Sequence, residues 1–105
     1  SGQIDAARAL GVDVVELHTG AFCDSDGEAC KTELARLGDA ARAAVHCDLS
    51  CHAGHGLTFK TVTPVAAIPE ISELNIGHFL IGEAIFSGLE RSVARMRVLI
   101  DQAAE

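Results

Sequence analysis

Three short apolar stretches alternate with segments of helical periodicity, and this alternation most limits how the chain can fold. The first stretch, residues 12–18, is rich in β-branched residues and nearly continuous in apolar character, which is typical of a strand buried on both faces. Further strands are predicted at residues 47–53 and 74–77. Strands that alternate with helices form mostly parallel sheets. The sequence therefore predicts an α/β fold with parallel strands.

The segments between and around the strands are predicted to be helical. An alanine-rich stretch at residues 4–10 ends at Gly11, a residue type that readily closes a helix. Residues 29–45 form an amphipathic pattern, and its apolar positions are Leu34, Leu37, Ala41, Ala44 and Val45. Thr63 and Pro64 fit the N-cap and first position of a short helix that runs through Ile68.

The C-terminal part of the chain predicts two consecutive helices. Residues 78–86 form the first, and Ser87 with Gly88 separates it from the second. The second helix carries apolar residues at helical spacing, namely Leu89, Val93, Met96, Leu99 and Ile100. With 105 residues and no linker-like segment, residues 1–105 are expected to form a single domain.

Composition excludes some classes of partner. The formal net charge of -7 argues against nucleic acid and anionic membranes, because both require a basic surface. No apolar run approaches the ~20 residues of a membrane span. A cytoplasmic location is expected, and in that compartment the four cysteines are expected to be reduced thiols.

Three parallel strands alone would leave apolar edges exposed, and such edges invite pairing with another chain. The pattern therefore predicts association, either with further βα units or with other copies of the chain.

The segment Gly54-His55-Gly56 places an imidazole between two glycines directly after a predicted strand. In βα barrels, catalytic residues lie at the carboxyl ends of strands. Histidine is also well suited to proton transfer near neutral pH. The alternative is a loop histidine that only bonds a neighbouring carbonyl, and the tripeptide alone favours that alternative.

Residues 75–78 form a second candidate site, because Gly77 and His78 lie where a strand passes into a short helix. The free N–H groups at such a helix start can hold an anion. Barrels often bind phosphate there. An ordinary tight turn at Gly77 remains the alternative.

Two other groups of polar residues have open interpretations. Strand alternation places Glu16 and His18 on one face, where Glu16 either forms a structural ion pair or lines a polar site. The segment 46–52 contains two cysteines and two histidines, which suggests zinc. The C-x3-C spacing and the lack of a matching second pair favour structural cysteines, and no metal site is predicted.

Several blocks together resemble the pyridoxine 5′-phosphate synthase family. They are VELHTGAF at 15–22, HAGHGLTF at 52–59, AAIPEISELNIGH at 66–78 and IGEAIFSGLERSV at 81–93. The resemblance implies a (β/α)8 TIM barrel, of which this chain supplies roughly the last three βα units as a partial barrel. It implies a transferase of vitamin B6 biosynthesis. The reaction condenses 3-amino-2-oxopropyl phosphate with 1-deoxy-D-xylulose 5-phosphate, giving pyridoxine 5′-phosphate.

The resemblance also implies roles for individual residues. His55 matches the family's proton donor, and Gly56, Gly77 and His78 match its contacts to 3-amino-2-oxopropyl phosphate. Glu16 is a weaker candidate, for ordering the polar interior. The family's general bases and its contacts to the pentulose phosphate match no residue of this sequence. The chain alone is therefore expected to be inactive, and the complete enzyme is expected to be a homo-oligomer that needs no cofactor.

Two other functional classes compete with the enzyme. A noncatalytic βα fragment or self-assembly module would give the glycines a purely structural role. A small metal-binding protein would use the side chains of the segment 46–52. Stabilisation by phosphate distinguishes the first from the enzyme, because a ligand of the native state must stabilise that state. Metal analysis distinguishes the second.

Overall fold

The computed structural model describes residues 4, 6 and 9–104. The helices and strands follow one another in the order β1 (Val14–His18), α2 (Gly20–Cys23), α3 (Gly27–His46), β2 (Ser50–Gly54), α4 (Val62–Ala66), β3 (Ile71–Asn75), α5 (His78–Ser87) and α6 (Leu89–Ala104). The helix predicted at residues 4–10 lies partly outside the described residues, of which 4, 6 and 9 are helical. This order confirms the α/β prediction.

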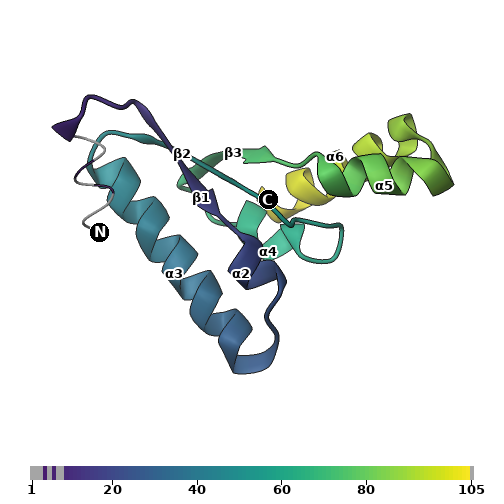
Figure 1. The fold of residues 1–105 in the computed structure, drawn as a ribbon, viewed down its shortest axis with the longest axis horizontal. Coiled ribbons are helices and arrows are strands. Elements are labelled where there is room, and N and C mark those ends of the chain that lie inside the picture. Colours follow the sequence, from purple (N-terminus) through teal and green to yellow (C-terminus); the bar gives the residue numbers. More distant parts are fainter. Residues whose placement is uncertain (1–3, 5, 7–8, 105) are drawn as a thin grey trace.

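The three strands form one parallel sheet in the order β1-β2-β3 (Figure 1). Along the first ladder Val14 pairs with Ser50 and His18 pairs with Gly54. Gly54 in turn pairs with Asn75 in the second ladder. The carboxyl ends of the three strands therefore meet at one edge of the sheet.

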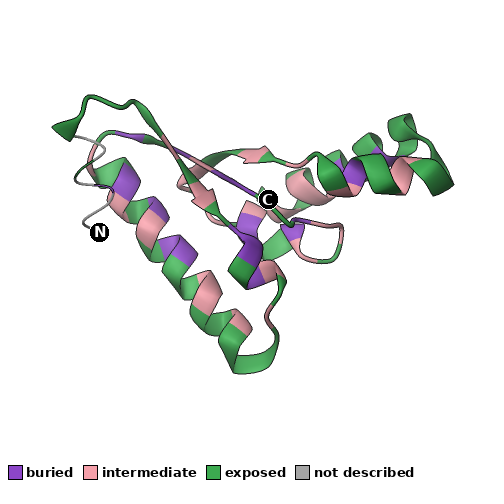
Figure 2. Ribbon diagram, viewed as in Figure 1, coloured by how far each residue is buried: buried purple, intermediate pink, exposed green. Residues whose placement is uncertain are grey.

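Helix α3 covers one face of the sheet. Ala41 and Ala44 on this helix are fully buried, in one cluster with Leu49 and with Cys51 of β2. Figure 2 shows such buried residues recurring along α3 between exposed ones. Burying a larger aliphatic side chain such as Leu49 contributes roughly 1.5–3 kcal/mol. Val45 departs from the predicted apolar face and is 46% exposed.

The prediction that the first strand is buried on both faces is wrong. Val14, Glu16 and His18 are exposed, whereas Val15 and Leu17 are half-buried and pack against the α3 cluster. Side chains alternate between the two faces of a strand. The described part of the chain covers only the face that carries Val15 and Leu17, and the other face stays open.

The boundaries of two strands differ from the prediction. β2 begins at Ser50 rather than at residue 47, because α3 continues to His46 and Asp48 turns the chain with a φ of 62°. β3 spans Ile71–Asn75 rather than 74–77, because its pairing with β2 already starts at Ile71. The short helix α2 was not predicted.

The N-cap predicted at Thr63 is wrong, since Thr61 holds that position and α4 begins at Val62. The carbonyl of Thr58 accepts hydrogen bonds from the N–H groups of Thr61 and Val62, at 3.3 and 3.0 Å. This turn starts the helix earlier than the sequence suggested. Pro64 is thus the third helical residue, where no intrahelical bond requires its N–H. The helix ends at Ala66 rather than at Ile68.

Helices α5 and α6 are separated at Gly88, which has a φ of 86°. This confirms the predicted pair, which lies at the opposite end of the molecule from α3 (Figure 1). Met96 of α6 is buried, but Leu89 and Val93 are 51% and 48% exposed. The predicted apolar face is therefore only partly covered. Within the described residues, none of the helices has the length and apolar character to cross a membrane.

Candidate functional site

An open cleft of about 760 Å³ lies at the carboxyl edge of the sheet. Glu16 and His18 of β1 line this cleft, together with residues 54–58, which begin at the last residue of β2, and residues 75–79, which begin at the last residue of β3. Ligands of open α/β sheets bind outside the carboxyl ends of the strands. The volume falls within the roughly 300–1,000 Å³ of small-molecule sites.

His55 enters the cleft on a constrained backbone. Its φ is 88°, in the left-handed region that non-glycine residues rarely adopt, and Gly56 follows with a φ of 80°. Such a backbone costs on the order of 1–3 kcal/mol and persists only where its surroundings enforce it. The buried Thr19 hydroxyl lies 2.6 Å from the carbonyl oxygen of His55 and 2.8 Å from that of Gly54. Thr19 thereby fixes the turn that carries His55.

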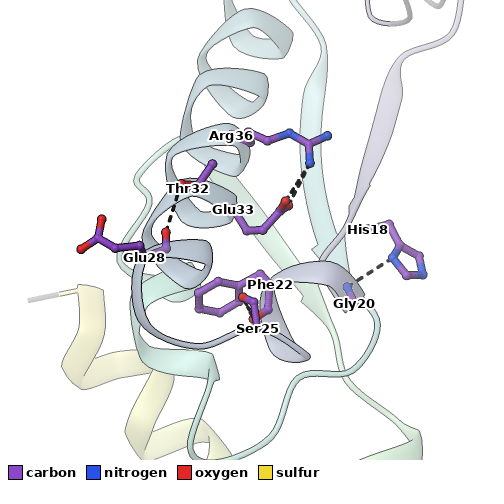
Figure 3. A network of polar contacts seen from close by, with 8 residues as sticks. All are labelled: His18, Gly20, Phe22, Ser25, Glu28, Thr32, Glu33 and Arg36. Carbon is purple, nitrogen blue, oxygen red and sulfur yellow. Dashed lines mark hydrogen bonds and ion pairs between the residues drawn. The ribbon is translucent and has the colours of Figure 1, made fainter.

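The imidazole of His55 stacks on that of His18. The two ring centroids are 4.1 Å apart and the ring planes differ by 30°. Nδ1 of His18 accepts a hydrogen bond of 3.2 Å from the backbone N–H of Gly20, at the start of α2 (Figure 3). The last residue of β1 and the turn that follows β2 thus bring two imidazoles together at the cleft.

Glu16 and Asn75 join β1 to β3 across the middle strand. Nδ2 of Asn75 donates a hydrogen bond of 3.0 Å to Oε1 of Glu16. A Cβ atom on Gly54 would lie 2.8 Å from that carboxylate oxygen and 2.8 Å from the Asn75 carbonyl oxygen. The bond therefore depends on glycine at position 54. Of the two interpretations left open for Glu16, the structure favours a residue that lines a polar site.

Gly77 and His78 lie at the start of α5, with Gly77 at the N-cap and His78 as the first helical residue. The first N–H groups of a helix have no intrahelical acceptor. No acidic residue lies in the first turn to compete for them. Phe79 packs edge-on against Phe59, with ring centroids 4.7 Å apart, and this contact joins the start of α5 to the loop between β2 and α4.

The four residues predicted to form the site all line this one cleft, namely His55, Gly56, Gly77 and His78. Sequence reasoning missed Asn75 as the partner of Glu16 and Thr19 as the anchor of the His55 turn. Both follow from the register of the sheet, which pairs Gly54 with His18 and with Asn75.

The cysteine and histidine segment is dispersed in the fold. His46 and Cys47 lie at the end of α3, whereas Cys51 points into the core. Nε2 of His52 lies 3.5 Å from a carboxylate oxygen of Glu73 on the neighbouring strand. In the part of the chain that the structure describes, no three His, Cys, Asp or Glu side chains are placed to hold a metal ion.

Cys51 is expected to resist alkylation. It is 1% exposed, and burial raises the pKa of its thiol, with a further contribution from the Glu70 carboxylate. The thiolate is the reactive form, so both effects slow the reaction. With iodoacetamide at pH 8, peptide mass spectrometry should show the half-buried Cys23 and Cys30 labelled roughly tenfold faster or more. Equal rates at the three thiols would contradict the buried position of Cys51.

Comparison with known proteins identifies relatives of the chain. A model of the family described as "Pyridoxal phosphate biosynthesis protein PdxJ" matches residues 1–102. The pyridoxine 5′-phosphate synthases of Rhodospirillum rubrum, Roseobacter denitrificans and Zymomonas mobilis are 63%, 57% and 56% identical to it. Each match covers 96% of this chain but only 41%, 42% and 40% of the respective relative. The chain thus spans about two fifths of the length of these relatives.

Proposed function

Because the chain belongs to the family of the pyridoxal phosphate biosynthesis protein PdxJ, we propose that it supplies the last three βα units of a (β/α)8 barrel. Its three strands are parallel and adjacent in chain order, as consecutive barrel strands are. Three of eight units also agrees with the two fifths of the relatives' length that the chain matches. Residues 1–105 are then one partial domain.

The open face of the sheet is the interior of this barrel. It carries two polar pairs, Glu16 with Asn75 and His52 with Glu73. A solvated outer face needs no such cross-strand pairing of polar groups, whereas an enclosed face requires it, because unpaired buried polar groups are costly. The covered face, by contrast, carries aliphatic side chains that pack on α3.

The complete protein, meaning a polypeptide of the relatives' full length that contains this chain, is a pyridoxine 5′-phosphate synthase. It condenses 3-amino-2-oxopropyl phosphate with 1-deoxy-D-xylulose 5-phosphate. The observation that carries this proposal is the cleft, where the His55 imidazole and the N-terminus of α5 share one cavity. These are a proton-transfer group and an anion-binding group, which a reaction between phosphorylated substrates requires.

His55 is the proton donor of this reaction. A protonated imidazole donates its ring proton to the oxygen that leaves during an elimination or dehydration step, and the ring is then in its neutral form. Histidine suits this exchange because its ordinary titration range lies near neutral pH. The constrained turn at residues 54–56 presents the ring to the cleft and limits the directions in which it can point.

The phosphate of 3-amino-2-oxopropyl phosphate binds between two loops. Gly56, Gly77 and His78 offer backbone N–H groups, and those of Gly77 and His78 lie at the positive end of the α5 dipole. Glycine at positions 56 and 77 lets a ligand approach the main chain closely. His78 adds a side chain that can donate to the phosphate when protonated.

The general bases and the contacts to 1-deoxy-D-xylulose 5-phosphate lie elsewhere in the complete barrel. A general acid without the general bases cannot complete the catalytic cycle, so the 105-residue chain alone is inactive. We place the complete protein in the cytoplasm as a homo-oligomer that uses neither cofactor nor metal. A noncatalytic assembly module is not favoured, because the relatives are named as synthases.

Gly77→Asp tests the phosphate site. A Cβ at Gly77 would meet nothing within 4 Å, and φ at this residue is -132°, so a side chain is tolerated. Aspartate is a good N-cap and should preserve or raise the melting temperature. Its charge faces the bound phosphate, so we expect KM for 3-amino-2-oxopropyl phosphate to rise by about tenfold or more.

Gly77→Asn is the matched control, because asparagine caps a helix as aspartate does and has nearly the same shape without the charge. Its KM should rise by much less than that of the aspartate variant. An unchanged KM in the complete Gly77→Asp protein, measured by steady-state kinetics, would place the phosphate elsewhere.

A further inference from the structure

We propose that His18 is a positioning residue for His55, whose ring it holds in the direction required for proton donation. This inference rests on the proposed role of His55 as the proton donor. It assigns a function to the stacked imidazoles of His18 and His55 at the cleft. The alternation of side chains along a strand does not by itself explain this contact.

The first observation is the stack itself. The ring centroids of His18 and His55 lie 4.1 Å apart at an interplanar angle of 30°. His55 is exposed on a turn, so little else packs against its side chain. Among the described residues, His18 is the ring in contact with it. The stack therefore restricts rotation of the His55 ring about its side-chain bonds.

The second observation is that His18 is itself fixed. Its Nδ1 accepts a hydrogen bond from the Gly20 N–H at 3.2 Å, so Nδ1 carries the lone pair and the proton of the neutral ring is on Nε2. Between these residues, Thr19 is fully buried and bonded to the carbonyls of Gly54 and His55. The residue next to His18 is thus bonded, through its side-chain hydroxyl, to the backbone carbonyl of His55.

The third observation concerns the space for the His18 ring. A Cβ atom on Gly20 would lie 2.5 Å from Cε1 of His18 and 3.3 Å from Cδ2 of His55. The His18 ring therefore occupies the place that a side chain at position 20 would need. Alanine at this position displaces the ring from the stack while leaving both imidazoles chemically intact.

Orientation of the donor governs the chemical step more than substrate binding. A misplacement of about 1 Å can cost roughly a hundredfold in rate. His18→Ala and Gly20→Ala in the complete protein should each lower kcat by about tenfold to a hundredfold. KM for 3-amino-2-oxopropyl phosphate should change by less than about twofold, since the phosphate contacts are untouched.

His18→Phe separates positioning from chemistry. Phenylalanine keeps a ring that can stack on His55 but has no nitrogen to exchange a proton. We expect kcat of this variant to return to within about threefold of the wild type, by the same orientation argument. Gly82→Ala is the matched control for Gly20→Ala, because a Cβ at Gly82 meets nothing within 4 Å.

The direct readout is NMR of complete protein labelled with 13C at the histidine rings, with the His55 signals assigned by their loss in His55→Asn. Stacking shields the His55 ring protons, so their resonances should move downfield in His18→Ala and Gly20→Ala, where the shielding ring is lost or displaced, and should stay upfield in His18→Phe, whose ring also shields them. A wild-type kcat in His18→Ala, or a kcat of His18→Phe no better than that of His18→Ala, overturns the inference. A wild-type kcat in His55→Asn would instead refute the proposed acid, and the NMR shifts alone would then decide whether His18 holds the ring.

Discussion

Replacing His55 with asparagine in the complete protein should lower kcat by about 10²–10⁴-fold, the contribution of a positioned general acid. Asparagine is chosen because it is among the residues that best tolerate the left-handed backbone, which His55 adopts with a φ of 88°. The turn held by Thr19 should therefore keep its shape. The loss should appear in kcat, while KM for the phosphate substrate stays near its original value.

His46→Asn is the control for this variant. His46 is exposed at the last residue of α3, outside the cleft, so its loss removes an imidazole without touching the site. Its kcat should equal that of the wild type. A His55→Asn protein that turns over at a normal rate would remove His55 from the mechanism.

Gly54→Ala should damage both stability and activity. The added Cβ would lie 2.8 Å from the Asn75 carbonyl oxygen and 2.8 Å from Oε1 of Glu16. The carbonyl belongs to the neighbouring strand and cannot rotate away, so β2 and β3 must shift apart. We expect a loss of about 1–3 kcal/mol, as for other overpacked sites. In a barrel of about 250 residues this lowers Tm by roughly 2–12 °C.

Activity of Gly54→Ala should fall beyond what the lost stability explains. The substitution separates Glu16 from Asn75. It also shifts the backbone at position 54, which directly precedes His55. Gly82→Ala is the control, because this position lies inside α5 with open space for a Cβ. It should stabilise the helix by about 0.5–1 kcal/mol. An unchanged Tm and an intact Glu16–Asn75 bond in a crystal structure of Gly54→Ala would contradict the tight packing described for position 54.

The order of strands and helices could be predicted because it depends on local patterns. The β-branched stretch at residues 12–18 and the apolar spacing of residues 29–45 each indicate one element without reference to the rest of the chain. The candidate residues could be predicted to meet for a related reason. Parallel strands place their carboxyl ends at one edge, so the loops that carry His55 and Gly77 had to be neighbours.

The features that escaped prediction depend on contacts between distant segments. The start of α4 is set by hydrogen bonds to the carbonyl of Thr58, which no helical spacing reveals. The stack of His18 on His55 and the bond between Glu16 and Asn75 follow from the pairing register. The burial of β1 was predicted wrongly. An apolar stretch indicates that both faces of a strand can be buried, but not that both are covered, and the described chain covers only one face of β1.

The most direct test is an assay for pyridoxine 5′-phosphate. The complete protein and the 105-residue chain are each incubated with 3-amino-2-oxopropyl phosphate and 1-deoxy-D-xylulose 5-phosphate, and the product is quantified by liquid chromatography and mass spectrometry. We expect the complete protein to form pyridoxine 5′-phosphate together with inorganic phosphate, and the chain alone to form none. No product from the folded complete protein, or equal turnover by the chain alone, would contradict a shared active site to which this chain contributes the proton donor and the phosphate site.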